Sequence, residues 1–203
     1  MRILLSAAVL SLMLVAVPRS QSADQARSSD FLERAFVANG RVTMDLTAGE
    51  YRITGRRDNR IRFDWSVRDG VRLSEVRARA DVRGLEAAIT TDGPDEANFR
   101  GAIQVPERAD LYIRLTAGEL TIEDIQGNKD IRLHAGEIRI DVGRPEDYQR
   151  VRASVWAGDL NAEPFHVTKG GLFRSFDWNG RGQYRLQARL KAGEIRLYSK
   201  ASN

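Results

Sequence analysis

The chain has 203 residues, of which 42% are hydrophobic, 30% are charged and 5 are proline, a composition typical of one folded domain rather than a disordered chain. It contains no cysteine, which excludes disulfide bonds, thiolate metal sites and a cysteine nucleophile. The 32 basic and 28 acidic residues give a net charge of +4, and arginine alternates with aspartate and glutamate, so no nucleic-acid partner is predicted.

Residues 1–22 have the pattern of a signal peptide. Arg2 precedes an apolar run over 3–17, and Ser20 and Ser22 have the small-residue spacing that a signal peptidase recognises. A membrane span needs roughly 20 residues, which is longer than this run. We therefore predict cleavage after Ser22, with Ala23 as a near alternative, and an exported chain over 23–203 that has no transmembrane span. Its location would be the periplasm, the cell surface or the exterior; an uncleaved N-terminal anchor is the alternative.

The most informative feature of the sequence is an octapeptide with Ala-Gly-acid at its centre. It occurs five times, at Leu46–Ile53, Leu115–Ile122, Leu133–Ile140, Val155–Ala162 and Leu190–Leu197. Weaker copies can be proposed around Gly84, Gly101 and Gly171. The glycines of neighbouring copies lie 18 residues apart at 118 and 136 and 22 apart at 136 and 158. A period of roughly 20 residues is typical of one coil of a β-solenoid.

Side-chain alternation predicts how each repeat folds. Before Gly136 the apolar residues are Ile131, Leu133 and Ala135, whereas after it they are Ile138 and Ile140. Because neighbouring residues of a strand point to opposite faces, this pattern requires a slip of one residue at Ala-Gly-Glu. A bulge or corner at glycine provides such a slip. Each repeat is therefore predicted to be a strand, a corner and a second strand, with the alanine inside and the acid outside.

Residues 31–198 resemble the bacterial adhesin-like β-strand-repeat family of unknown function, which is related to the head domains of some autotransporter adhesins. The resemblance rests on the opening strand over 40–53, Ile103–Pro106 before the strand from Leu111, glycines 118 and 136 flanking Ile125–Gly127, and the closing segment Gly180–Leu197. It implies a right-handed parallel β-helix-like arrangement, and adhesion only by fold analogy. The predicted fold is thus all-β: a single-domain parallel β-solenoid over 23–203, built as a stack of strand-Gly-strand repeats.

The acids at the predicted corners are the first candidates for chemistry. They are Glu50, Glu119, Glu137, Asp159 and Glu194. Stacked about 4.8 Å apart, such carboxylates are potential ligands of Ca²⁺. However, the aspartate-rich nonapeptide of calcium-binding solenoids is missing, and Arg52, Arg139 and Arg196 share the outward face. We predict a solvated ion-pair network with no metal site and no cofactor, and leave open whether these acids bind a cation.

No catalytic residue is predicted. His134 takes the outward position that Thr47, Thr116, Trp156 and Lys191 hold in the other copies, and His166 lacks a catalytic partner. Asp64, Asp69, Asp92 and Asp95 come from the less repetitive first half, where a loop could collect them, but Asp69-Gly70 and Asp92-Gly93-Pro94 are also strong turn signals. The chain is therefore predicted not to be an enzyme, with a carbohydrate-active β-helix enzyme as an outside possibility.

Outward aromatic residues are the remaining indication of binding. The alternation of side chains along their strands places Tyr112 and Trp156 on the outer face. Trp178 lies beside Gly180–Gly182 in a predicted loop. A cap over the end of the stack, made by Phe173, Phe176 and Trp178, is the alternative. We predict an exported, non-enzymatic module of the cell surface or envelope that has a binding or a structural role. Its partner would be a glycan or an envelope protein. The alternative is an accessory or sensor subunit that pairs with an envelope protein; the oligomeric state is left open.

Overall fold

The computed structural model describes residues 29–67, 72–94 and 98–200, so the predicted signal peptide over 1–22 lies outside the described residues. The prediction of an all-β fold is confirmed. The strands are β1 (Ser29–Ala35), β2 (Arg41–Leu46), β3 (Gly49–Arg56), β4 (Arg60–Ser66), β5 (Arg77–Arg83), β6 (Glu86–Asp92), β7 (Phe99–Pro106), β8 (Asp110–Glu123), β9 (Lys129–Asp141), β10 (Tyr148–Ala162), β11 (Val167–Asn179) and β12 (Tyr184–Tyr198). Single 3₁₀ turns occur at η1 (Leu73–Glu75), η3 (Pro145–Asp147) and η4 (Glu163–Phe165).

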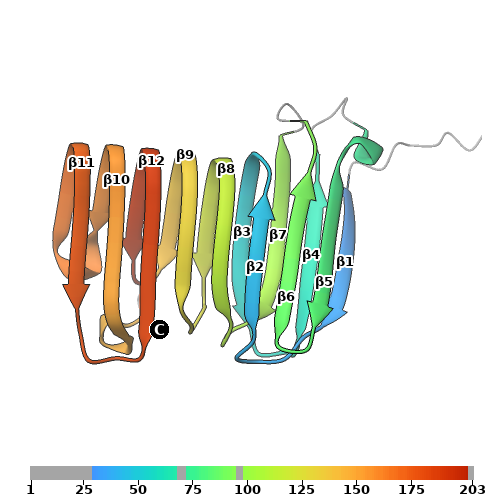
Figure 1. The fold of residues 1–203 in the computed structure, drawn as a ribbon, viewed down its shortest axis with the longest axis horizontal. Coiled ribbons are helices and arrows are strands. Elements are labelled where there is room, and N and C mark those ends of the chain that lie inside the picture. Colours follow the sequence, from blue (N-terminus) through green and yellow to red (C-terminus); the bar gives the residue numbers. More distant parts are fainter. Residues whose placement is uncertain (1–28, 68–71, 95–97, 201–203) are drawn as a thin grey trace, which may run out of the picture.

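These strands form one mixed sheet of 12 strands that is doubled over into two layers (Figure 1). The second layer follows the order β1-β4-β7-β3-β8-β9-β12-β10-β11. The first layer contains β5, β6 and β2, which continue into the first halves of β8, β9, β12 and β10. The long strands β8, β9, β12, β10 and β11 therefore belong to both layers, and the core lies between the layers.

A ladder of glycines marks the fold line. In space, the bend glycines follow the order Gly49, Gly118, Gly136, Gly193, Gly158 and Gly171, each in register with the next. The φ angle of Gly136 is 131°, a conformation that side chains disfavour, and a Cβ there would lie 1.8 Å from the carbonyl oxygen of Gly118. The bends therefore need glycine for close backbone approach as well as for the φ angle. The weaker copy at Gly171 belongs to this ladder, whereas Gly84 lies in the turn between β5 and β6, and Gly101 lies inside β7.

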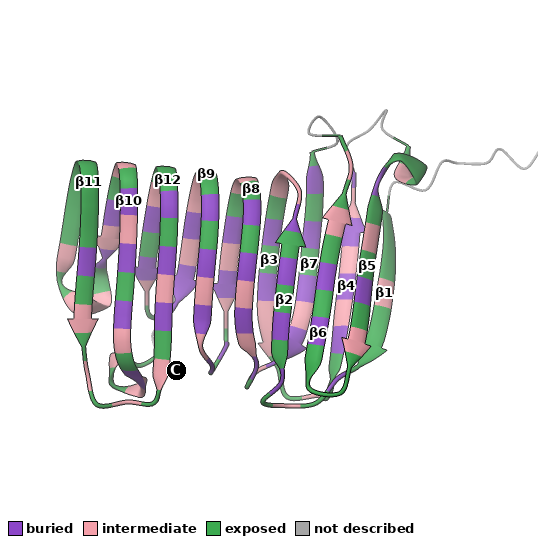
Figure 2. Cartoon of the chain, viewed as in Figure 1, coloured by how far each residue is buried: buried purple, intermediate pink, exposed green. Residues whose placement is uncertain are grey.

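The predicted change in side-chain parity at the bend is confirmed. On β8, Leu111, Ile113 and Leu115 are buried before the bend, and Leu120 and Ile122 are buried after it. Figure 2 shows the same alternation of buried and exposed residues along the neighbouring strands. The core is continuous between the two layers.

The prediction that the corner alanines lie inside is wrong. Ala135 and Ala192 are exposed, and Ala117 and Ala157 are half-buried. The bend turns the chain from one layer to the other at these residues, so their side chains lie at the rim rather than between the layers. A small residue suits this crowded rim, where neighbouring backbones approach closely.

The wholly parallel pairing predicted for a β-solenoid is wrong, because the sheet is mixed. The sheet differs in two ways from a parallel stack of repeats in chain order. First, β12 lies between β9 and β10, so the last repeat is inserted before the fourth. Second, the ends are antiparallel: β11 pairs with β10, β4 with β7, β5 with β6 and β1 with β4. Parallel pairing is confined to the middle of the sheet.

A lysine lies in the core at one end of the strand β9. Lys129 is 2% exposed, and its Nζ donates hydrogen bonds to the carbonyl oxygens of Ile125 and Gly127 and to the Tyr148 hydroxyl, at 2.9 to 3.0 Å. Burial lowers the pKa of this ammonium to about 7, although Asp141 and Asp110 oppose the decrease. The side chain fastens the loop between β8 and β9 to β10.

Candidate binding surface

The three aromatic residues predicted for binding do not meet. Tyr112 is half-buried on the outer face of β8, with the Arg41 guanidinium carbon 5.0 Å from its ring centre. Trp156 is 57% exposed on the outer face of β10, immediately before the bend. The strands β9 and β12 separate the two.

Trp178 faces the core instead of a loop. It lies in β11, opposite the buried Val151, and residues directly opposite on paired strands share a face. Its ring centre is 5.1 Å from that of Phe165, which also packs on Phe176. The loop position predicted for Trp178 is therefore wrong, and the packing matches the alternative of a cover over the end of the core. Phe173, the third residue of that predicted cap, is 71% exposed.

Trp156 belongs to a row of outward side chains along the fold line, which we call the bend row. In spatial order it consists of Thr47, Thr116, His134, Lys191 and Trp156. The Lys191 Nζ lies 2.9 Å from the His134 Nε2, which must accept the hydrogen bond because an ammonium can only donate. At the far end, the Phe173 ring stands edge-on to Trp156, with 5.6 Å between ring centres. The predicted surface position of His134 is confirmed, because the residue is exposed.

Beside the bend row lies a second row of charged residues. Arg114, Arg132 and Arg189 are in register on β8, β9 and β12, and Asp45 on β2 precedes them. The two rows border an open groove of about 760 Å³, which we call the basic groove and define by Asp45, Arg114, Arg132, His134, Arg189 and Lys191. Its floor includes the edges of four aligned leucines, at 46, 115, 133 and 190.

The cations of the basic groove have few counter-charges. Arg114 is 3.9 Å from Asp45, and Arg132 is 3.7 Å from Asp130; both arginine side chains are more than half exposed. Exposed pairs at such distances contribute little. Among residues 29–67, 72–94 and 98–200, Arg189 and Lys191 have no carboxylate within 4.0 Å. The groove therefore carries an excess of positive charge.

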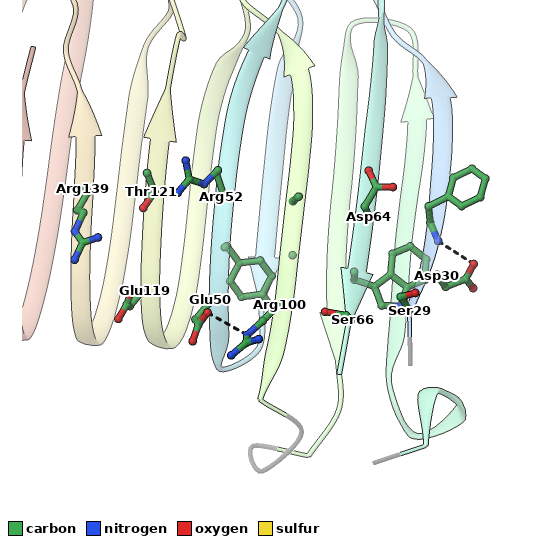
Figure 3. Close-up of a pocket in the computed structure, with 15 residues that line it drawn as sticks. Ser29, Asp30, Glu50, Arg52, Asp64, Ser66, Arg100, Glu119, Thr121 and Arg139 are labelled. Carbon is green, nitrogen blue, oxygen red and sulfur yellow. Dashed lines mark hydrogen bonds and ion pairs between the residues drawn. The ribbon is translucent and has the colours of Figure 1, made fainter. Parts of the chain in front are cut away.

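The outer face of the second layer holds a larger groove of about 1150 Å³, which we call the mixed-charge groove. Its charged residues include Glu50, Arg52, Asp64, Arg100, Glu119 and Arg139, and Glu50 pairs with Arg100 at 3.3 Å (Figure 3). The floor is low at Gly101 and Ala102, where larger side chains are missing. Positive and negative side chains alternate here, in contrast to the basic groove.

The corner acids do align, but in spatial rather than chain order. Glu194 lies between Glu137 and Asp159 because β12 is inserted between β9 and β10. Part of the expected ion-pair network is present: Arg139 pairs with Glu137, and Arg196 pairs with Glu194 at 2.7 Å. Arg52 pairs with Glu123 instead of a corner acid. Within the described part of the chain, no group of three or more acidic, histidine or cysteine side chains is arranged to hold a metal ion.

The remaining acids considered for catalysis do not gather in one place. Asp64 lines the mixed-charge groove and is held by Arg62, with oxygen to nitrogen distances of 2.6 and 2.7 Å. Asp92 ends β6, whereas Asp69 and Asp95 lie outside the described residues. His166 is exposed after η4, at a φ of 55°.

Sequence reasoning missed the basic groove, although the sequence contained a signal for it. Arg114, Arg132 and Arg189 each stand four residues before a bend glycine. Extending the alignment of the repeats by one residue before the octapeptide would have placed these arginines in one outward row. The burial of Lys129 also had a signal in the sequence, because Lys129 lies on the same strand face as the inward residues Ile131 and Leu133.

Comparison with known proteins identifies the fold but not a family. No family model and no curated protein matches the sequence. A crystal structure of a putative cell adhesion protein from Clostridium sporogenes is similar over 85% of this chain and 100% of its own, with a TM-score of 0.54 and 12% identity. A putative adhesin from Bacteroides fragilis matches 84% of this chain and 97% of its own, with a TM-score of 0.34 and 12% identity. A putative lipid binding protein from Parabacteroides distasonis matches 85% and 95%, with a TM-score of 0.25 and 8% identity.

None of the described residues form a helix that is long and apolar enough to cross a bilayer.

Proposed function

We propose that the protein is an exported, non-enzymatic binding module that attaches to a component of the cell surface or envelope. In this proposal the glycine-bent strands form a solenoid-like stack, and the basic groove together with Trp156 is the binding site. The fold shared with the cell adhesion protein from Clostridium sporogenes is compatible with this role, but at 12% identity it supports the fold alone.

The observation that carries the proposal is the contrast between the two faces of the repeat. Inward positions repeat almost without change, as in the aligned leucines, whereas the bend row holds threonine, histidine, lysine and tryptophan. An indole that is 57% exposed, braced by a second ring, is unusual on a surface that otherwise carries charged residues. Exposed aromatic side chains of this kind are common centres of binding.

The experiment is retention of the purified protein on intact cells and on isolated envelopes. We expect Trp156→Ala to lower retention at least about tenfold, because an aromatic anchor that the partner buries on binding typically contributes about 2 kcal/mol or more. Arg108→Glu is the matched control, since Arg108 is exposed in the loop between β7 and β8, at the opposite end of the strand from the bend. The proposal fails if wild-type protein is not retained, or if Trp156→Ala and Arg108→Glu behave alike.

The absence of catalysis is part of the proposal. The acids of the mixed-charge groove are accompanied by guanidinium groups, as in the pair of Glu50 with Arg100 and that of Asp64 with Arg62. A glycosidase needs one carboxyl group that donates a proton and a second that acts as base or nucleophile. Incubation with envelope polysaccharides should therefore produce neither new reducing ends nor unsaturated sugars. Either product, removed by Asp64→Asn, would support the carbohydrate-active enzyme instead.

One observation favours a second candidate, an accessory or sensor subunit. In the described part of the chain β11 pairs only with β10, and it exposes Leu172 at 58% and Phe173 at 71%. A free strand edge beside apolar side chains is suited to pairing with a strand of another protein. A stoichiometric envelope partner that is lost in Leu172→Asp/Phe173→Asp but kept in Trp156→Ala would support this candidate over the binding module.

A further inference from the structure

We propose that the basic groove binds a linear acidic glycan, with the anionic groups on Arg114, Arg132, Arg189 and Lys191 and one sugar ring on Trp156. This inference rests on the proposed function and specifies the chemical class of its ligand.

The first reason is the like-charge ladder. Arg114, Arg132 and Arg189 occupy directly adjacent register positions on three neighbouring strands. Like charges opposite one another destabilise a sheet. Two of the three have only a distant carboxylate, at 3.9 Å for Arg114 and 3.7 Å for Arg132. By contrast, Arg150 and Arg152 both pair with Asp177, at 2.7 and 2.9 Å. In the basic groove the neighbouring bend row contributes a further cation, Lys191, and no acid. An anionic ligand would relieve this repulsion.

The second reason is geometry. The groove crosses the strands, because its residues come from β2, β8, β9 and β12, and Trp156 on β10 continues the same line. Neighbouring strands lie about 4.8 Å apart, and one sugar unit advances a linear glycan by a similar length. Consecutive acidic sugars could therefore meet consecutive arginines. A guanidinium can bind a carboxylate or sulfate through two parallel hydrogen bonds, which a lysine cannot do.

The third reason is that the rest of the groove suits a sugar. The hydroxyls of Thr47 and Thr116 can donate and accept hydrogen bonds with sugar hydroxyls. The edge-on contact with Phe173 fixes the orientation of the Trp156 ring and leaves it 57% exposed. A sugar can then lie flat on the indole. Proteins that bind single-stranded nucleic acid stack successive bases on several aromatic rings. The groove offers one indole beside four cations, so it is poorly suited to that ligand.

The test is binding of the exported protein to four defined polymers by titration calorimetry. Polygalacturonate carries a carboxylate on every sugar, dextran sulfate carries sulfates, dextran is neutral, and double-stranded DNA is a polyanion without a pyranose chain. We expect binding to polygalacturonate or dextran sulfate that is at least about tenfold tighter than binding to dextran or DNA. The affinity should fall about tenfold or more between about 50 mM and about 200 mM salt, because release of counterions drives such binding.

The matched variants are Arg132→Glu/Arg189→Glu in the groove and Arg108→Glu outside it. The double variant should lose at least tenfold in affinity for the acidic glycan, while Arg108→Glu stays within twofold of wild type. The inference is overturned if neutral dextran or DNA binds as tightly as the acidic glycans, if no acidic glycan binds, or if the two variants behave alike.

Failure of this inference can be told apart from failure of the proposed function. Retention on envelopes that is lost in Trp156→Ala but kept in Arg132→Glu/Arg189→Glu would mean that the site is right and the anionic class is wrong. No retention of wild-type protein on cells or envelopes would overturn the proposed function itself. Circular dichroism of each variant checks that the charge reversals leave the β fold intact.

Discussion

At the scale of single residues, the bend glycines and the buried lysine are the positions where the chain tolerates substitution least. Four of the glycines, at 118, 136, 158 and 193, combine two constraints, because their φ angles are positive and an added Cβ would lie 1.8 to 1.9 Å from a neighbouring carbonyl oxygen. Lys129 combines burial with three hydrogen bonds that hold a loop. Each allows a specific prediction.

Gly136→Ala should destabilise the protein by about 3 kcal/mol or more, because the new Cβ would lie 1.8 Å from the Gly118 carbonyl oxygen and the backbone would have to shift. The control is Gly84→Ala, which shares a positive φ but has no atom within 4 Å of the new Cβ. It should cost only about 1 to 2 kcal/mol, the strain of the left-handed conformation itself. Urea unfolding measures both. Equal losses would mean that close approach does not matter at the bend.

Lys129 should make stability depend on pH. Its pKa in the folded chain is about 7, below the ordinary lysine value of 10.5, so between these pH values the unfolded chain keeps a proton that the folded chain has released. The cost of burying the ammonium is thus fully present below about pH 7 and is relieved as the pH rises. Wild type should therefore gain stability relative to Lys129→Met between about pH 6 and about pH 9, by up to about 1.4 kcal/mol per pH unit. A difference that stays constant over this range would contradict the lowered pKa.

At the scale of strands, insertion of β12 places the last described strand in the interior of the sheet. It pairs with both β9 and β10, and Ile195 and Leu197 are fully buried. Chain ends normally fray, but amides of a doubly paired, buried strand exchange slowly. We expect hydrogen exchange in β12 to be as slow as in β9, and exchange in β1 and β11 to be much faster. Fast exchange across β12 would argue against the insertion.

The strands and their bends could be predicted from the sequence, because alternation and its slip at glycine are local properties. Residues 133–140 show this, with Leu133 inward before the bend and Ile138 inward after it. The stacking order could not be predicted. The copy around Gly193 shares six of its eight residues with the copy around Gly136, and the copy around Gly158 shares two, but likeness between copies does not determine which strands pair. The difference between them lies in the connections: β11 follows β10 as an antiparallel neighbour, and the chain then returns between β9 and β10.

The candidate site was predictable only in part, again for a physical reason. The alternation of side chains placed Trp156 correctly on the outer face. Trp178 was assigned to a loop instead, because the alternation could not be followed in a segment without a repeat. Residue Trp178 faces the core because β11 runs antiparallel to β10 and sets it opposite Val151. The basic groove arises from register between strands, a property of the folded chain that appears in the sequence only after the repeats are aligned.

At the scale of the whole molecule, the two outer faces have different charge patterns. The second layer carries acids and arginines in alternation around the mixed-charge groove, and the first layer carries an arginine ladder beside the fold line. The net charge of +4 hides this asymmetry. Local excess charge rather than net charge steers an ionic partner, so the two faces should differ in ligand affinity. In the described part of the chain, the edge strands β1 and β11 each pair on one side only, and they add a third, distinct type of surface at the ends of the stack.

Hydrogen exchange of the protein with and without saturating acidic glycan compares these three surfaces in one measurement. The proposed binding site predicts slowed exchange in β8, β9 and β12 on the approach to the fold line, around Arg114, Arg132 and Arg189, together with the segment around Trp156. Slowed exchange confined to β3 and β7 beneath the mixed-charge groove, or to the β11 edge, would contradict it.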